Sequence, residues 1–106
     1  MNTEFRRFEI LLPLQFNDGT AVPEEMIVEV ELELERQFGS ISTETQRIRG
    51  RWQQEGHTYR DELIRLFIDE PDTPDNKQFF REYKEILKAR FQQKDIWLTS
   101  TPIDVY

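Results

Sequence analysis

Apolar and polar residues alternate in the first strand that the chain predicts, residues 5–16. Every second position on one face is apolar: Phe8, Ile10, Leu12, Leu14 and Phe16. Pro13 has no N–H to donate, so the strand should end or become an edge there. The residues that follow, Asn17-Asp18-Gly19, are typical of a turn.

Residues 23–38 fit two structures. The segment VEVELELE, residues 28–35, alternates as a strand would. Pro23 followed by two glutamates is instead typical of a helix start, and Gly39 suits a helix C-terminus. One helical stripe would hold the apolar residues Ile27, Val30, Leu34 and Phe38. Because a strand would also align four glutamates on one face, we predict a helix.

Residues 42–68 predict a β-hairpin with Glu55-Gly56 as its two-residue turn. This register pairs Gln54 with His57, Trp52 with Tyr59, Arg49 with Glu62, and Ile48 with Leu63. One face then carries Trp52, His57, Tyr59, Asp61, Leu63 and Phe67. The other carries Arg49, Arg51, Arg60, Glu62, Ile64, Leu66 and Ile68.

A loop over residues 69–76 leads to a second predicted helix, with Thr73 as N-cap and Pro74 as first helical residue. The apolar stripe of this helix comprises Phe79, Phe80, Tyr83, Ile86, Leu87 and Phe91. Arg81 and Glu85 should form an ion pair on the solvent-exposed face of this helix. Ile96, Trp97 and Leu98 open a last strand, which Pro102 should interrupt.

The predicted order is βαββαβ in a single domain, residues 1–106. It predicts an α+β, ferredoxin-like fold, with two helices on one face of a four-stranded antiparallel sheet. The other face has no cover within the chain. The second hairpin strand and the segment at Trp97 are nevertheless apolar on both sides. We therefore expect a homodimer through the open sheet face, with a bound apolar ligand as the alternative.

The net charge and the composition exclude some classes of binding partner and indicate where the protein is located. The formal net charge of −7 disfavours nucleic acid and anionic membrane surfaces. The chain contains no cysteine, no apolar run of membrane-spanning length, and no secretory signal in MNTEFRRFEI. These features predict a cytoplasmic protein with no cofactor.

The hairpin also carries the candidate chemistry. His57, Tyr59 and Asp61 share one strand face and could transfer protons, with the imidazole as general base. The alternative is a solvated hairpin tip held by the Trp52–Tyr59 pair. Arg47, Arg49, Arg51 and Arg60 form a basic stripe suited either to pairing with the surplus acids or to an anionic ligand. The acidic residues of 69–75 lack the ligand pattern of a calcium loop, so we predict no metal site.

Several short motifs resemble those of a group of short uncharacterised bacterial proteins. They are Gly50-x-Trp52, Tyr59-x-Asp61-Glu62, Tyr83-Lys84, and Arg90-Phe91-x-Gln93 followed by Ile96. The resemblance implies a compact ferredoxin-like domain and supplies no catalytic residues. Two functions fit the sequence. The first is a dimeric binding or interaction module that uses Trp52, Arg49, Arg51 and Arg60. The second is a small enzyme of dimeric α/β-barrel type that uses His57, Tyr59 and Asp61.

Overall fold

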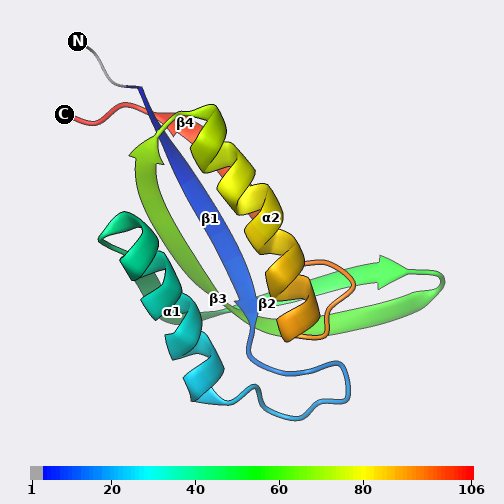
Figure 1. The fold of residues 1–106 in the computed structure, drawn as a ribbon. Helices are drawn as coiled ribbons and strands as arrows, with labels where there is room; N and C mark the ends of the chain where they lie inside the picture. Colours follow the sequence, from blue (N-terminus) through cyan, green and yellow to red (C-terminus); the bar gives the residue numbers. More distant parts are fainter. Residues whose placement is uncertain (1–3) are drawn as a thin grey trace.

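The computed structural model describes residues 4–106 and has the predicted order βαββαβ (Figure 1). The elements are β1 (Phe5–Pro13), α1 (Glu24–Phe38), β2 (Ser42–Gln54), β3 (His57–Pro71), α2 (Pro74–Arg90) and β4 (Leu98–Ile103). The antiparallel sheet has the strand order β2-β3-β1-β4, and both helices cover the same face. The predicted ferredoxin-like α+β class is confirmed. Residues 1–3, which begin the segment where we expect no secretory signal, lie outside the described residues. Within residues 4–106, no helix combines the length and the apolar character needed to cross a membrane.

Residues 24–38 form a helix, so the prediction of a helix over a strand is confirmed. The helix places Glu24 and Glu25 in its first turn, where the N-terminal dipole favours acids. It ends at Gly39, whose φ of 90° suits a residue without a side chain. The helix buries the apolar stripe Ile27, Val30 and Leu34. A strand of the same sequence could not bury these residues together.

The second helix begins as predicted, and three details of its surroundings differ. The Thr73 hydroxyl accepts a hydrogen bond from the Asn76 N–H at 3.1 Å, which confirms the N-cap. Ile86 is 50% exposed, so its place on the buried stripe was wrong. The Arg81–Glu85 ion pair is not formed, because Glu85 pairs with Lys88 at 3.1 Å. The loop predicted from residue 69 starts later, since β3 continues to Pro71 in register with β1.

Pro13 and Pro102 both lie at positions in the sheet where the absence of a backbone N–H removes little hydrogen bonding. β1 ends at Pro13, three residues beyond the Ile10–Leu98 pair where its pairing with β4 stops. Pro102 lies inside β4 and does not interrupt it. β4 is an edge strand, so a residue without an N–H is tolerated there. The predicted break at Pro102 was therefore wrong.

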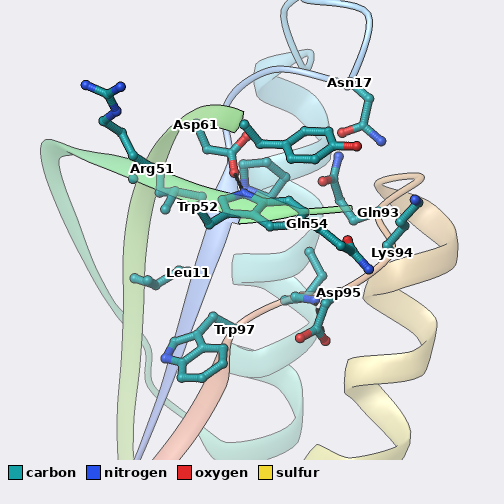
Figure 2. A pocket seen from close by; sticks show the side chains of 15 residues that line it. Leu11, Asn17, Arg51, Trp52, Gln54, Asp61, Gln93, Lys94, Asp95 and Trp97 are labelled. Carbon is teal, nitrogen blue, oxygen red and sulfur yellow. Dashed lines mark hydrogen bonds between the residues drawn. The ribbon is translucent and has the colours of Figure 1, made fainter. Parts of the chain in front are cut away.

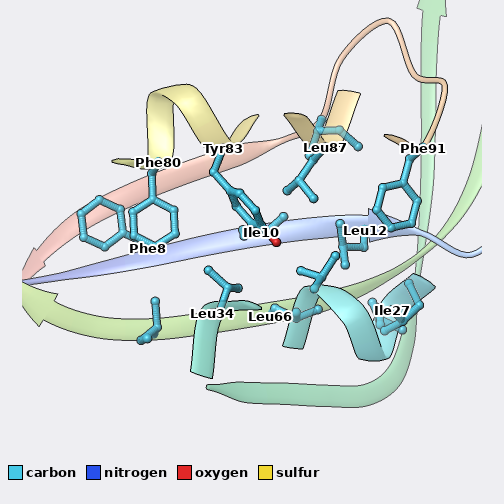
Figure 3. Close-up of a cluster of buried hydrophobic side chains, with 14 of the residues drawn as sticks. Phe8, Ile10, Leu12, Ile27, Leu34, Leu66, Phe80, Tyr83, Leu87 and Phe91 are labelled. Carbon is cyan, nitrogen blue, oxygen red and sulfur yellow. The ribbon is translucent and has the colours of Figure 1, made fainter. Parts of the chain in front are cut away.

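The hydrophobic core lies between the helices and one face of the sheet (Figure 3). The register places Ile10 opposite Leu66 and Leu12 opposite Ile64, so alternate residues of β1 and β3 face the helices together. Both helices cover this layer with side chains that are almost fully buried: Ile27, Val30, Leu34, Phe80, Tyr83, Leu87 and Phe91. Phe8 and Phe80 stack with ring centroids 4.2 Å apart. The apolar residues that recur every two positions in the strands and those that recur every 3.6 positions in the helices thus pack into one continuous core.

A polar network ties the two helices together above this core. The Glu33 carboxylate of α1 accepts hydrogen bonds from the Tyr83 hydroxyl at 2.8 Å and from the Arg90 guanidinium, both on α2. The Arg90 guanidinium is the main cause that lowers the pKa of Glu33, and the Tyr83 hydroxyl adds to it. Burial raises the pKa of Tyr83, and the neighbouring Glu33 carboxylate raises it further. The network therefore stabilises Glu33 as a carboxylate and Tyr83 as a neutral phenol.

This network makes a pH-dependent contribution to stability. Because the folded-state pKa of Glu33 is lower than its unfolded value, the contribution is complete above the ordinary glutamate pKa. It is lost as the pH falls through the folded-state pKa. At pH 7, Glu33→Gln should reduce the free energy of unfolding by about 1.5 kcal/mol, the lower end for a hydrogen bond to a charged group. Urea melts of both proteins between pH 7 and pH 3 should show this difference shrinking. A difference that does not change with pH would contradict the assignment.

Candidate functional site

The parts of β2 and β3 nearest the hairpin turn, residues 48–63, form an arm that extends beyond both helices (Figure 1). Glu55 and Gly56 both have positive φ, 53° and 79°, as a two-residue hairpin turn requires. The predicted register is confirmed from this turn to Ile48–Leu63. The register then shifts at an irregularity between Glu44 and Ile48, which the alternation of apolar and polar residues does not reveal.

One face of the arm is aromatic and carries an ordered carboxylate. The Trp52 and Tyr59 rings stack across the strands, with centroids 4.3 Å apart and planes inclined by 15°. The Trp52 indole N–H donates a hydrogen bond to Asp61 Oδ2 at 2.7 Å. Asp61 and Tyr59 are only partly exposed, and Trp52 is 40% exposed. The indole therefore holds the carboxylate in place and still presents surface to a ligand.

These residues line a cavity of about 710 Å³ on the open face of the sheet (Figure 2). The arm contributes Gly50, Arg51, Trp52, Gln54, Tyr59, Asp61 and Leu63; β1 adds Leu11 and Pro13; the loops add Asn17, Gln93, Lys94, Asp95, Ile96 and Trp97. Figure 2 shows Trp52 above this space and Trp97 below it. A cavity of this size, with mostly apolar walls and a few fixed polar groups, is typical of small-molecule sites.

Gly50 has no side chain and so leaves space in this cavity next to Leu63. A methyl group at its Cα would lie 3.3 Å from Leu63 Cδ1, closer than most such contacts. A larger side chain at residue 50 would therefore displace Leu63 and fill part of the space. The glycine of the Gly50-x-Trp52 motif has a role in the shape of the cavity.

The loop between α2 and β4 closes the opposite side of the cavity. Gln92 adopts a positive φ of 56° directly after the helix, which turns the chain towards the arm. The Lys84 ammonium lies 3.0 Å from Asp95 Oδ1 and is the main cause that lowers the pKa of Asp95. The Ile96 N–H also donates to Asp95 Oδ1, at 3.0 Å. Asp95 is thus a fixed carboxylate in the wall of the cavity.

The rest of the open face is more polar than the sequence indicates. Arg7 forms a two-point contact with Asp69, at 2.7 and 2.9 Å, and lowers the pKa of that carboxyl. Arg65 bonds Glu9 and lies 4.3 Å above the Phe67 ring centroid. These ion pairs occupy the middle of the face. Its exposed apolar surface is therefore concentrated at the cavity.

The predicted proton-transfer group is only partly assembled. Tyr59 and Asp61 line the cavity, whereas His57 lies exposed beside the turn and does not. The His57 and Tyr59 ring centroids are 6.5 Å apart, and the Asp61 carboxylate is held by Trp52. Strand residues two positions apart share a face without having to touch, so the shared face did not ensure contact.

The predicted ligand- or partner-binding residues divide between the two faces of the arm. Trp52 lines the cavity, whereas the Arg51 guanidinium points away from it (Figure 2). Arg49 and Arg60 share the face of Arg51. Arg49 lies opposite Glu62 as predicted, but the Glu62 carboxylate pairs with Arg47 at 3.0 Å. The cross-strand position of Arg49 is therefore confirmed, whereas the ion pair of Glu62 is formed with Arg47.

Several cavity residues were not identified from the sequence: Leu11, Asn17, Gln93, Lys94 and Asp95. They come from loops and a strand that are distant in sequence from the arm. Outside the arm, the cavity residues that carried a signal were Trp97, an apolar residue on the uncovered side, and Gln93 and Ile96, which belong to the motifs of the resemblance. Within residues 4–106, no three His, Cys, Asp or Glu side chains lie close enough to hold a metal ion.

Comparison with known proteins shows a likeness of fold to a solved structure. No protein-family model and no curated protein matches the chain. The resemblance to short bacterial proteins therefore stays a prediction. Among solved structures, a phage SAM lyase in complex with S-methyl-5'-thioadenosine aligns with a TM-score of 0.70 and 16% identity. The alignment covers 100% of this chain and 89% of that chain. At this identity the likeness establishes a shared fold over the whole chain.

Proposed function

We propose that the protein is a small cytoplasmic binding domain for a nucleoside thioether or sulfonium of the S-methyl-5'-thioadenosine class. The observation that carries the proposal is the aromatic cavity with Trp52 and Trp97 on two sides and the fixed carboxylates of Asp61 and Asp95 in its walls. The similarly folded SAM lyase with S-methyl-5'-thioadenosine supports this choice of ligand.

The walls of the cavity suit the parts of such a ligand. A purine ring can stack on the exposed side of the Trp52 indole, because its other side already packs on Tyr59. Ribose hydroxyls are hydrogen-bond donors, and the Asp61 and Asp95 carboxylates are acceptors. A sulfonium cation would be attracted both to these carboxylates and to an aromatic face. The Leu11 and Leu63 side chains provide apolar surface for a methylthio group.

Titration of the protein with S-methyl-5'-thioadenosine tests this proposal. Calorimetry should show saturable binding, and the Trp52 indole N–H resonance should shift during the titration. Adenine alone should bind more weakly, because it lacks the ribose hydroxyls and the thioether. Absence of saturation at millimolar ligand, or shifts confined to residues outside the cavity, would refute the proposed ligand class.

A second candidate function is cleavage of S-adenosylmethionine, favoured by the activity named for the similarly folded protein and by Tyr59 and Asp61 in the cavity. In such a reaction an oxygen of the substrate's own carboxylate bonds to the chain carbon next to sulfur, and the bond from that carbon to sulfur breaks, so the four-carbon chain leaves as a lactone. The electron pair of the broken bond moves to sulfur, which leaves S-methyl-5'-thioadenosine. Incubation with S-adenosylmethionine and detection of this product by mass spectrometry tests the activity. Loss of the product in Asp61→Asn would assign it to the cavity. Binding without product formation would support the binding domain and reject the enzyme.

We further propose a homodimer in which a second copy covers the open face and encloses the cavity. Trp97 is 64% exposed and lines the same cavity as Leu11 and Leu63. Exposed apolar surface of this kind is typical of interfaces, and two-fold pairing is the commonest closed arrangement. The ion pairs of Arg7 and Arg65 would lie within or around the contact.

Light scattering at micromolar concentration should therefore give twice the chain mass of 12.9 kDa. Trp97→Lys should shift the protein towards the monomer, because it places a charge in the apolar contact. Ile86→Lys is the matched control, since Ile86 is also exposed but lies on α2, away from the open face. Wild-type protein that is monomeric over a hundredfold concentration range would contradict the dimer.

A further inference from the structure

The face of the arm opposite the aromatic cavity carries three arginines around a second hollow. Arg49, Arg51 and Arg60 line a space of about 430 Å³ together with Gln15, Asp61 and Glu62. The register sets Arg51 directly opposite Arg60. Like charges in such cross-strand positions destabilise a hairpin. This arrangement therefore needs a compensating partner.

The chain itself does not supply that partner. Acidic residues outnumber basic ones, 21 to 14, so carboxylates are in surplus. Yet no carboxylate within residues 4–106 forms an ion pair with Arg49, Arg51 or Arg60. Five other arginines do form ion pairs: Arg6, Arg7, Arg47, Arg65 and Arg90.

The two carboxylates that line the hollow are already engaged. Glu62 pairs with Arg47 at 3.0 Å. Asp61 accepts the Trp52 indole N–H on the opposite face of the arm. With both carboxylates counted, the three guanidiniums still leave the hollow positively charged. It therefore attracts an anion even though the whole chain has a net charge of −7.

We propose that this hollow is a binding site for a phosphate-type oxyanion, either free or as the terminal group of a larger ligand. Guanidinium groups match such an anion with paired N–H donors, and each contact is a charge-assisted hydrogen bond. Arg51 and Arg60 provide donors from adjacent strands, Arg49 adds a third, and the Gln15 amide can donate from the β1–α1 connection. A nucleic acid is disfavoured, because the rest of the acidic surface would repel its backbone. The proposal is independent of the occupant of the aromatic cavity.

NMR titration with sodium phosphate, compared with sodium chloride at equal ionic strength, tests the site. Amide resonances of residues 49–51 and 60–62 should shift and saturate with phosphate only. Arg51→Gln/Arg60→Gln should weaken phosphate binding about tenfold or more. Arg60→Gln alone is a second variant, with a smaller loss in the same direction. Arg81→Gln is the matched control, because Arg81 is exposed on α2 and should leave binding unchanged.

A thermal melt provides an independent measurement of the same site. Without phosphate, the double variant should be at least as stable as the wild type, because the opposed charges are gone. Phosphate should raise the melting temperature of the wild type and not that of the double variant. Glycerol phosphate distinguishes the two sources of the anion. Tighter binding than inorganic phosphate at the same amides indicates a phosphate on a larger ligand, and equal binding indicates the free anion. Equal effects of chloride and phosphate, or equal losses in the double variant and Arg81→Gln, would overturn the proposal.

Discussion

Replacing Phe91 with alanine should lower the free energy of unfolding by about 3–5 kcal/mol, the usual cost of removing a fully buried phenyl ring. Phe91 has no exposed surface and belongs to the cluster formed by both helices and the sheet. It lies at the C-terminal end of α2, directly before the loop that forms one wall of the cavity. The substitution should therefore weaken both the core and the loop.

Denaturant melts monitored by circular dichroism measure this effect. Ile86→Ala is the matched control, because it also shortens an apolar side chain of α2 but at a position that is 50% exposed. Its free energy of unfolding should change by less than about 1 kcal/mol. Similar losses for Phe91→Ala and Ile86→Ala would contradict the position of α2 on the sheet.

Replacing Trp52 with alanine should weaken binding of S-methyl-5'-thioadenosine by about tenfold to a hundredfold. A stacked base contributes about 1–3 kcal/mol on an aromatic side chain, and the substitution removes that surface. It also frees the Asp61 carboxylate, which then loses the indole N–H that positions it. Calorimetric titration of the variant gives the ratio of dissociation constants directly.

Trp52→Phe separates these two contributions. The phenyl ring keeps a stacking surface but cannot donate to Asp61, so binding should fall between the wild type and Trp52→Ala. Tyr106→Ala is a control, since this aromatic side chain is fully exposed at the C-terminus and outside the cavity. A Trp52→Ala variant that binds as tightly as the wild type would remove the indole from the proposed site.

The motifs that resemble the bacterial proteins coincide with positions that shape the molecule. Tyr83 and Arg90 both bond Glu33 across the helices, and Lys84 fixes Asp95 beside the cavity. Phe91 is a core residue, and Gln93 lines the cavity. The motifs at the end of α2 thus connect helix packing to the wall of the proposed site.

Local chemistry determined the elements of this protein. The hairpin register depends on the two-residue turn Glu55-Gly56 and on alternation along two adjacent strands, which are short-range properties. The choice of helix for residues 24–38 depended on Gly39 and on a stripe at helical spacing, also visible in one segment. From six such elements in the order βαββαβ, the fold class followed.

Only the tertiary structure decided which side chains meet. Glu62 lies opposite Arg49 but pairs with Arg47, because long charged side chains can reach several partners around their own position. Asp61 is held by Trp52 and not by His57, because sharing a strand face does not bring two side chains into contact. The cavity combines the arm with the loop at Gln93–Trp97, at least thirty residues away in sequence. Its shape depends on the twist of the sheet and on where α2 ends, which no single segment of the sequence encodes.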